Sequence, residues 1–471
     1  MGALVLRKSI ATGLIAACVL FAVPASALAA DLGGDCCADL EERIAELEAT
    51  TARKGNRKVS LTVSGWVTQQ VMFWDDGKDD AGSGPVFPGL NNGNDRGRNV
   101  YVHDLGSTLG SHFKFSGQAN FAPGWDAGYT LHIGAISSDG LRHGQDTDNG
   151  PSAIGDNVHI LQSYWFIRSE TLGKLSLGRQ SQASDNTAIL ADGSGSAISA
   201  NWVAFDVASF RLRRTNDGSL PGINWADAGG CHFMGGAWGD CNGLPRNVVR
   251  YDSPTFGGFS ASASWGEDDM WDVAARYADT WGDFKVALAA AYAETTDEDM
   301  GGRAHTLIAI DGLEYFQAGA YFEHVPTGLF AYGAYGKLRT ALPADIFGGF
   351  EIPESVTYYA KGGVRQRWSS LGATVLYGEY LRNSDGFFND IEFPVGSGTF
   401  GPFTFTVAGQ SKLDMWGLGL VQEIDAAAMS VWIKYRRMSF DVDATLDGFD
   451  LTGGTEYEDF QYIGAGAIIH F

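Results

Sequence analysis

Long apolar runs are largely missing from this sequence. Beyond residue 30 no apolar run reaches the ~18 residues from which a membrane-spanning helix is read, so a helical membrane protein is excluded. Basic residues are also scarce, at 33 Lys and Arg against 56 Asp and Glu, which gives a formal net charge of −23. The sequence has no basic stripe that could contact a phosphate backbone, so nucleic acid is excluded as a partner.

The sequence also lacks the motifs of common enzymes. It contains no G-x-S-x-G elbow, no H-E-x-x-H pair and no phosphate-binding loop of the G-x-x-x-x-G-K type. The 9 histidines are scattered and form no constellation. An enzyme is therefore disfavoured, and we expect no catalytic residues, no cofactor and no bound metal.

Cysteine is rare, with 5 residues in the whole chain. Beyond the N-terminal apolar run the cysteines are Cys36, Cys37, Cys231 and Cys241. In an exported protein, the spacing of Cys231 and Cys241 predicts a disulfide. A zinc site with His232 as third ligand is the alternative, but no fourth ligand stands at a useful spacing. The pairing of Cys36 and Cys37 stays open.

The first 30 residues have the pattern of a secretory signal peptide. Basic residues precede an apolar run over residues 10–23, and residues 25–30 offer small side chains to signal peptidase. A transmembrane anchor is the alternative, but the run is short and ends at Pro24. We therefore expect residues 1–30 to be removed on export.

Residues 31–57 are rich in charge and predict a short helix. Leu40, Ile44 and Leu47 have the spacing of an a/d seam. Since isolated helices of this length are marginal in water, the segment predicts self-association through a coiled coil. An amphipathic helix lying against the rim of a barrel is the alternative.

From residue 58 the pattern changes to an alternation of apolar and polar side chains. Val63, Val67 and Phe73 share one face of a predicted strand, and Thr68 and Gln70 share the other. A soluble sandwich also alternates, but its apolar faces must meet a second sheet. A membrane barrel shows its apolar face to lipid and its polar face to a lumen. Residues 413–424 do not alternate cleanly.

The connections distinguish these two folds, because very short turns alternate with long polar connections. The long connections are expected at 75–98, 138–156, 181–246, 266–270, 296–314, 340–354, 382–411 and 442–458. This asymmetry is typical of outer-membrane barrels. The sequence therefore predicts an all-β fold: a transmembrane antiparallel barrel of about 16 strands over residues 58–471, with every short turn at one end.

The connection over residues 181–246 is the longest. A stretch of this length without regular structure inside a compact domain is usually functional. We interpret it as a loop that folds into the barrel and narrows the pore, where its charges would set a local field facing the wall. It carries both signs of charge, including Asp185, Asp192, Asp206, Arg211, Arg213 and Arg214.

The chain resembles porins of the alphaproteobacterial family. The resemblance rests on residues 58–66, 177–180, 247–254 and 259–263, and it covers the whole mature chain. It implies a homotrimer of 16-stranded barrels in the outer membrane of a Gram-negative bacterium, in contact with membrane lipid and lipopolysaccharide, with the third external loop folded inward. The final strand, which ends at Phe471, is similar to the terminal strands that the barrel insertion machinery reads.

The resemblance also implies a function: a passive, water-filled pore for ions and small hydrophilic solutes. It suggests that Arg179 lies on the wall opposite the loop, although strict alternation after Leu177 points Arg179 outward. Lys114, Arg250 and Arg276 have inward parity without this conflict.

Two further hypotheses come from other classes. A substrate-specific channel would use aromatic residues of the long connection as a binding ladder, although aromatics that anchor a loop to the wall are the commoner case. These residues are Trp202, Phe205, Phe210 and Trp225. A structural role, in which residues 31–57 tether the cell envelope, is compatible with transport.

Overall fold

In the computed structural model the described residues are 59–78, 97–106, 108–136, 138–146, 158–230, 244–267, 269–296, 312–342, 349–391, 394–400 and 403–471. All of them belong to one compact unit, Gly55–Phe471. The signal peptide, the predicted helix over residues 31–57 and the cysteines beyond residue 30 lie outside the described residues. These predictions therefore stay predictions.

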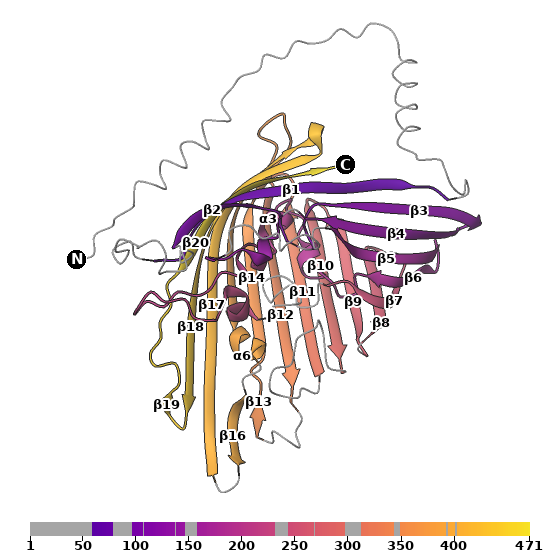
Figure 1. Cartoon of the computed structure of the whole chain (residues 1–471). Coiled ribbons are helices and arrows are strands. Elements are labelled where there is room, and N and C mark those ends of the chain that lie inside the picture. The colour runs from indigo at the N-terminus through magenta and orange to yellow at the C-terminus, as the bar shows by residue number, and fades with distance from the viewer. Residues whose placement is uncertain are drawn as a thin grey trace. The chain divides into compact units, whose positions relative to one another are not determined.

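The described residues form one antiparallel sheet (Figure 1). Its first ten strands are β1 (Thr62–Asp75), β2 (Arg98–His103), β3 (His112–Ala122), β4 (Trp125–Ala135), β5 (Val158–Ser169), β6 (Gly173–Gln180), β7 (Arg246–Asp252), β8 (Phe259–Gly266), β9 (Trp271–Trp281) and β10 (Phe284–Thr295). The remaining strands are β11 (Gly312–His324), β12 (Leu329–Ala341), β13 (Phe350–Glu351), β14 (Ser355–Gln366), β15 (Thr374–Ser384), β16 (Val395–Phe400), β17 (Phe403–Ile424), β18 (Met429–Leu446), β19 (Phe449–Asp450) and β20 (Phe460–His470).

The sheet closes because its first and last strands pair. β1 pairs with β20 from Trp66↔His470 to Asp75↔Gln461, and on its other side it pairs with both β2 and β3. β2 and β3 therefore make one strand of the barrel, interrupted by residues 104–111. With the short strands β13, β16 and β19 set aside as parts of connections, the barrel has 16 strands, which confirms the predicted fold.

The short turns all lie at one end of the barrel, here called the short-turn end. Examples are the residues between β3 and β4 and between β9 and β10. The long connections hold the short helices η2 (Gly140–Arg142), η3 (Ile189–Ala191), α3 (Ala197–Ala200), α4 (Ala204–Val207), α5 (Trp225–Gly229) and α6 (Gly386–Asp390), whereas η5 (Asp425–Ala427) belongs to a short turn. No helix in the described part of the chain is long and apolar enough to cross a membrane.

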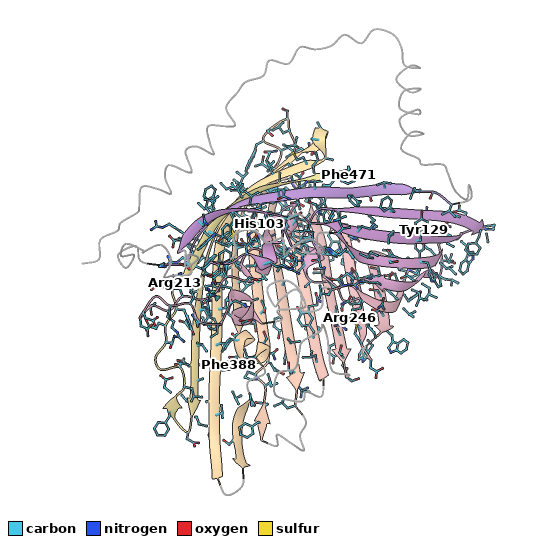
Figure 2. All side chains as sticks on the ribbon, viewed as in Figure 1. His103, Tyr129, Arg213, Arg246, Phe388 and Phe471 are labelled. Atoms are coloured by element: carbon cyan, nitrogen blue, oxygen red, sulfur yellow. The ribbon has the colours of Figure 1, made fainter. Side chains whose placement is uncertain are left out.

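The outer face of the barrel is apolar and rich in aromatic side chains. Near the short-turn end its exposed aromatics are Phe121, Phe256, Phe259, Trp281, Phe284, Trp368 and Phe471. Toward the other end they are Phe73, Trp265, Trp271, Phe316, Tyr358, Tyr380 and Trp416. Membrane barrels carry an apolar band on their outer face, with one girdle of aromatic residues at each of the two membrane–water interfaces. The two groups of aromatics fit these girdles. Tyr129 and Phe471, both exposed, are labelled in Figure 2.

Glycines opposite large aromatic rings let neighbouring strands pack closely. Tyr377 pairs in register with Gly419, and a Cβ at Gly419 would lie 2.2 Å from the Tyr377 ring. Trp432 covers Gly466 in the same way, at 2.5 Å. An aromatic side chain laid over a cross-strand glycine fills the space that the missing side chain leaves, and it helps to fix the register.

Candidate functional site

The inside of the barrel is occupied along much of its wall by the connection between β6 and β7. Its described part, residues 181–230, is called the inner segment. The segment folds inward, as the fold prediction stated, and it carries η3, α3, α4 and α5. Most of its residues up to Leu212 are buried, although it contains no long helix or strand of its own. Contacts with the wall therefore hold it in place.

The inner segment is first anchored on β8, β9 and β11. The Ala183 amide donates to Ser264 Oγ at 3.0 Å, and the Ser184 amide donates to Asp272 Oδ2 at 2.7 Å. Gln317 then accepts from the Ala188 amide at 2.8 Å and donates to the Ser184 carbonyl at 2.9 Å. The backbone of the segment thus replaces water as the partner of these inward-facing side chains.

Two predicted wall residues hold the same stretch. Arg250 Nη1 donates to the carbonyls of Ser181 and Gln182 at 2.9 and 3.0 Å. Arg276 Nη2 donates to the Ala183 carbonyl at 2.7 Å and to Thr187 Oγ1 at 2.8 Å. Both arginines face inward, as their parity predicted.

Asp192 is bound to the wall beyond this anchor. Its Oδ2 lies 2.5 Å from Lys361 Nζ on β14, and both side chains are fully buried. Asn201 donates to the same oxygen at 3.0 Å and accepts from Lys361 at 2.8 Å. Asp192, Asn201 and Lys361 therefore form a closed polar triad between α3 and β14.

Asp206 on α4 is the centre of a larger buried network. Its Oδ2 accepts from Lys434 Nζ at 2.6 Å and from the Tyr462 hydroxyl at 2.8 Å, and its Oδ1 accepts from Gln70 Nε2 at 2.7 Å. Arg436 Nη1 lies 3.3 Å from Oδ2, and Arg436 Nε donates to Glu379 at 2.8 Å. The network joins the inner segment to β1, β15, β18 and β20.

These cations decide the ionisation of Asp206. Burial would raise the pKa of its carboxyl, but the nearby charges of Lys434 and Arg436 together outweigh burial and lower the pKa to about 2. Asp206 is therefore an anion at neutral pH, even though it has almost no contact with water.

Asp192 and Asp206 were expected to set a local electric field in the passage, but both carboxylates are buried. Both carboxylates are neutralised by wall cations rather than exposed to water. Sequence reasoning missed most of their partners, namely Lys434, Arg436 and Tyr462, and it also missed Glu379, which pairs with Arg436. The available signal was a charged side chain at an inward-facing position of a strand, as for Lys361, Lys434 and Arg436.

An apolar layer packs next to the Asp206 network. Phe210 and Leu212 are fully buried, and the Phe210 ring lies 4.9 Å from the Trp74 ring and 4.8 Å from the Phe460 ring. Leu413 and Met415 on β17 face inward into the same core and are also fully buried. The barrel thus contains a hydrophobic core on the inner side of its wall.

The remaining part of the inner segment meets the other long connections. Arg213, labelled in Figure 2, is buried and forms a two-pronged pair with Asp76, at 2.9 Å from Nε and 2.8 Å from Nη2. Arg211 pairs with Asp146, and Gln145 exchanges hydrogen bonds with the Arg211 backbone.

Three more of the predicted constriction residues lie outside the contacts described so far. Asp185 accepts from Asn186 Nδ2 at 2.6 Å within the segment itself, and Arg214 bridges to Tyr457 in the last long connection. Lys114 faces inward on β3, in register with Ser64 and His132.

The expected position of Arg179 on the inner wall is wrong. Its exposed side chain shares the outer face of β6 with Leu175 and Leu177, so strict alternation was right and the position suggested by family resemblance was wrong.

Other inward insertions were also missed by sequence reasoning. Residues 104–111 interrupt the second barrel strand, and residues 138–146 pack against them and against the inner segment. Tyr101 donates to the Gly144 carbonyl at 2.8 Å, and Ser209 donates to the Leu141 carbonyl at 2.5 Å. Among the residues described, no group of metal-ligating side chains is placed to hold an ion.

Comparisons with known proteins agree with this architecture. The model of the Gram-negative porin family matches residues 14–393. Among solved structures, the chain is similar to the anion-selective porin from Comamonas acidovorans, at 15% identity and a TM-score of 0.51, over 88% of this chain and 100% of that chain. No curated protein sequence matches the chain.

Two further solved structures are similar at lower scores. One is OmpT of Vibrio cholerae, at 11% identity and a TM-score of 0.47, over 89% of this chain and 99% of that chain. The other is the outer membrane channel DcaP of Acinetobacter baumannii, at 8% identity and a TM-score of 0.48, over 89% and 100%. The family match covers most of the chain, which therefore belongs to the Gram-negative porins and forms a diffusion pore in the outer membrane.

Proposed function

We propose that the pore is passive and water-filled, that it passes ions and small hydrophilic solutes, and that residues 181–246 set its width. One observation carries this proposal: the inner segment is bound to the inner wall from Ala183 to Arg213 by buried polar and apolar contacts. A segment held in this way reduces the open cross-section permanently. The rest of the lumen is left to solutes.

The residues predicted for the constriction divide into two roles in this proposal. Asp192, Asp206 and Arg213 are anchors, because each is buried in an ion pair. Lys114, Arg250 and Arg276 belong to the inner wall, where Arg250 and Arg276 also hold the start of the inner segment. Asp185, Arg211 and Arg214 are further charged residues of the inner segment. Arg179 has no part in the pore, because it lies on the outer face.

A substrate-specific channel is the alternative function. Its proposed aromatic ladder would need rings that a solute can reach. Trp202, Phe205, Phe210 and Trp225 are all buried among other apolar side chains. Their burial supports the anchoring role instead, and we propose that the chain is a channel without enzymatic activity.

The assembly we propose is a homotrimer of the alphaproteobacterial porin type, supported by the a/d seam over residues 31–57. Deleting these residues should give barrels that insert but dissociate more readily in mild detergent. An intact mature protein that runs as a monomer would contradict the trimer. We also propose that the outer aromatic girdles contact membrane lipid and lipopolysaccharide, and that the barrel insertion machinery recognises Phe471.

Reconstitution of the purified mature protein in a planar bilayer tests the proposed pore. Conductance reports the width of the passage, and the reversal potential under a salt gradient reports its ion selectivity. We expect stable, long-lived open channels whose conductance rises in proportion to salt concentration. Folded protein that inserts but carries no current would refute the proposal. Competition by one solute at low concentration would favour the substrate-specific alternative.

A further inference from the structure

Ion pairs line the inner wall of the barrel at the short-turn end. Their residues are Asp126 with Arg168, Lys174 with Asp252, Lys285 with Glu323, and Arg365 with Glu423. Each is the last or next-to-last residue of its strand at that end. In a porin the short turns are periplasmic, so this group, called the rim ring, surrounds the periplasmic exit of the pore.

All members of the rim ring face the lumen. Their neighbours along the strands are exposed apolar residues of the outer face, such as Tyr251 beside Asp252 and Phe284 beside Lys285. The pairing register also places them in rows. Asp126, Arg168, Lys174 and Asp252 are successive register partners across β4, β5, β6 and β7.

The cation is the more exposed partner in every pair of the rim ring. The exposed fractions of the side chains are 45% for Arg168 against 16% for Asp126, and 48% for Lys285 against 5% for Glu323. The difference has the same sign for Lys174 over Asp252, at 31% against 23%, and for Arg365 over Glu423, at 29% against 20%. Each pair is thus a dipole whose positive end is the more exposed to water.

Two more cations on the same inner wall form no ion pair with a carboxylate in the described part of the chain. Arg276 donates only to neutral oxygens, those of Ser262, Ala183 and Thr187. Lys114 has the side chains of Ser64 and His132 beside it in register. The nearby carboxylate Asp272 is buried and accepts hydrogen bonds from serine hydroxyls.

We propose that the rim ring attracts anions and favours solutes that carry a carboxylate or phosphate group, although the whole chain has a net charge of −23. The inference rests on the proposed pore. Coulomb attraction falls with distance and dielectric constant, so a guanidinium or ammonium group in the passage acts on an ion more strongly than a carboxylate lying behind it. The effect is greatest at low salt, because screening extends over about 10 Å at 0.1 M.

The test compares Lys285→Gln and Arg168→Gln with Arg382→Gln in planar bilayers under a salt gradient. Arg382 also loses a positive charge in an ion pair, with Asp414, but it lies on the outer face. Each rim variant should lower the chloride-to-potassium permeability ratio by about twofold at low salt, whereas Arg382→Gln leaves it unchanged. Resistance of each variant to unfolding in detergent confirms that its barrel is intact.

A solute assay gives a second readout. In liposome swelling, the rate for gluconate relative to that for glucose should fall in both rim variants and stay at the wild-type value in Arg382→Gln. Rim variants that conduct normally but change neither ratio more than Arg382→Gln would overturn the anion ring while leaving the pore standing. A wild-type protein without conductance would instead overturn the pore and the ring together.

Discussion

Lys434 Nζ lies 2.6 Å from Asp206 Oδ2, and both side chains are 2% exposed. Taking two charges out of water is costly, and their attraction offsets the cost only when the remaining polar atoms are also paired. Asp206 meets this condition through Gln70 and Tyr462, and Lys434 meets it through the Ser199 carbonyl at 2.8 Å. Such a pair can fix one position of the inner segment, since displacement would leave several buried groups without partners.

We first predict the effect of Asp206→Ala. The substitution leaves Lys434 and Arg436 buried without their shared carboxylate, and removing one partner of a buried pair costs about 3–5 kcal/mol. We expect the inner segment to detach for part of the time, seen as strong current noise in single-channel recordings. Asp217→Ala is the control, because Asp217 is an exposed carboxylate of the same segment. Quiet currents at the wild-type level in Asp206→Ala would show that this pair does not hold the segment.

A second prediction concerns acid. Because the pKa of Asp206 is lowered to about 2 from an ordinary value of 3.8, its stabilising contribution is complete above the ordinary value and is lost only as pH falls through about 2. Hydrogen exchange of the Ala208 and Phe210 amides, corrected for the intrinsic pH dependence, should show equal protection at pH 7 and pH 5. Loss of protection over that interval would mean that another titrating group controls the segment.

The barrel could be predicted from the sequence because its signals are local. Alternation, turn residues and the lengths of connections gave the strand count, and parity alone was right for Arg179 even against family resemblance. The same rule failed over residues 413–424, and the structure gives the reason. Leu413, Met415 and Val421 face inward but are apolar, because the inner segment covers them and no water-facing residue is needed there.

The partners of the inner segment could not be predicted, because they depend on contacts between distant parts of the chain. Asp206 and Lys434 are separated by 228 positions, and nothing in the local pattern around either residue specifies the other. The expectation that loop carboxylates face the passage followed from composition alone. Composition does not distinguish a carboxylate open to water from one paired with a buried lysine.

A third prediction tests the packing of aromatic rings over glycines. In Gly419→Val the new Cβ would lie 2.2 Å from the Tyr377 ring, so the ring must leave its position. Overpacking of this kind typically costs about 1–3 kcal/mol, and we expect a lower unfolding temperature in detergent. Gly222→Val is the matched control, because a Cβ at Gly222 would meet no atom within 4 Å. Equal stability of the two variants would refute a role for Tyr377 and Gly419 in strand packing.

A fourth prediction is a disulfide between Cys231 and Cys241, which lie outside the described residues. Export favours oxidation, and a short closed loop restrains the unfolded chain by about 3 kcal/mol in chain-entropy terms. Mass mapping of the non-reduced protein should find one peptide pair joined through these cysteines. Recovery of both as free thiols would exclude the bond.

The last prediction concerns a deletion within the inner segment. Removing residues 202–217 takes away Asp206, Phe210 and Leu212 together, so the passage should widen and single-channel conductance should rise. The hydrogen-bonded ladder of the barrel closes without the segment, and the deleted barrel should therefore still insert.

Stability, however, should fall in the same variant. The deletion exposes inward apolar residues such as Leu413 and Met415 to lumen water, and each buried side chain of that size contributes about 1.5–3 kcal/mol. Phe210→Ala separates the two effects, because it removes one buried ring, at a cost of about 3–5 kcal/mol, while the segment stays in the lumen. We expect this variant to unfold at a lower temperature with nearly unchanged conductance. If the deletion also left conductance unchanged, the inner segment would not limit the pore, and the width would be set elsewhere along the wall.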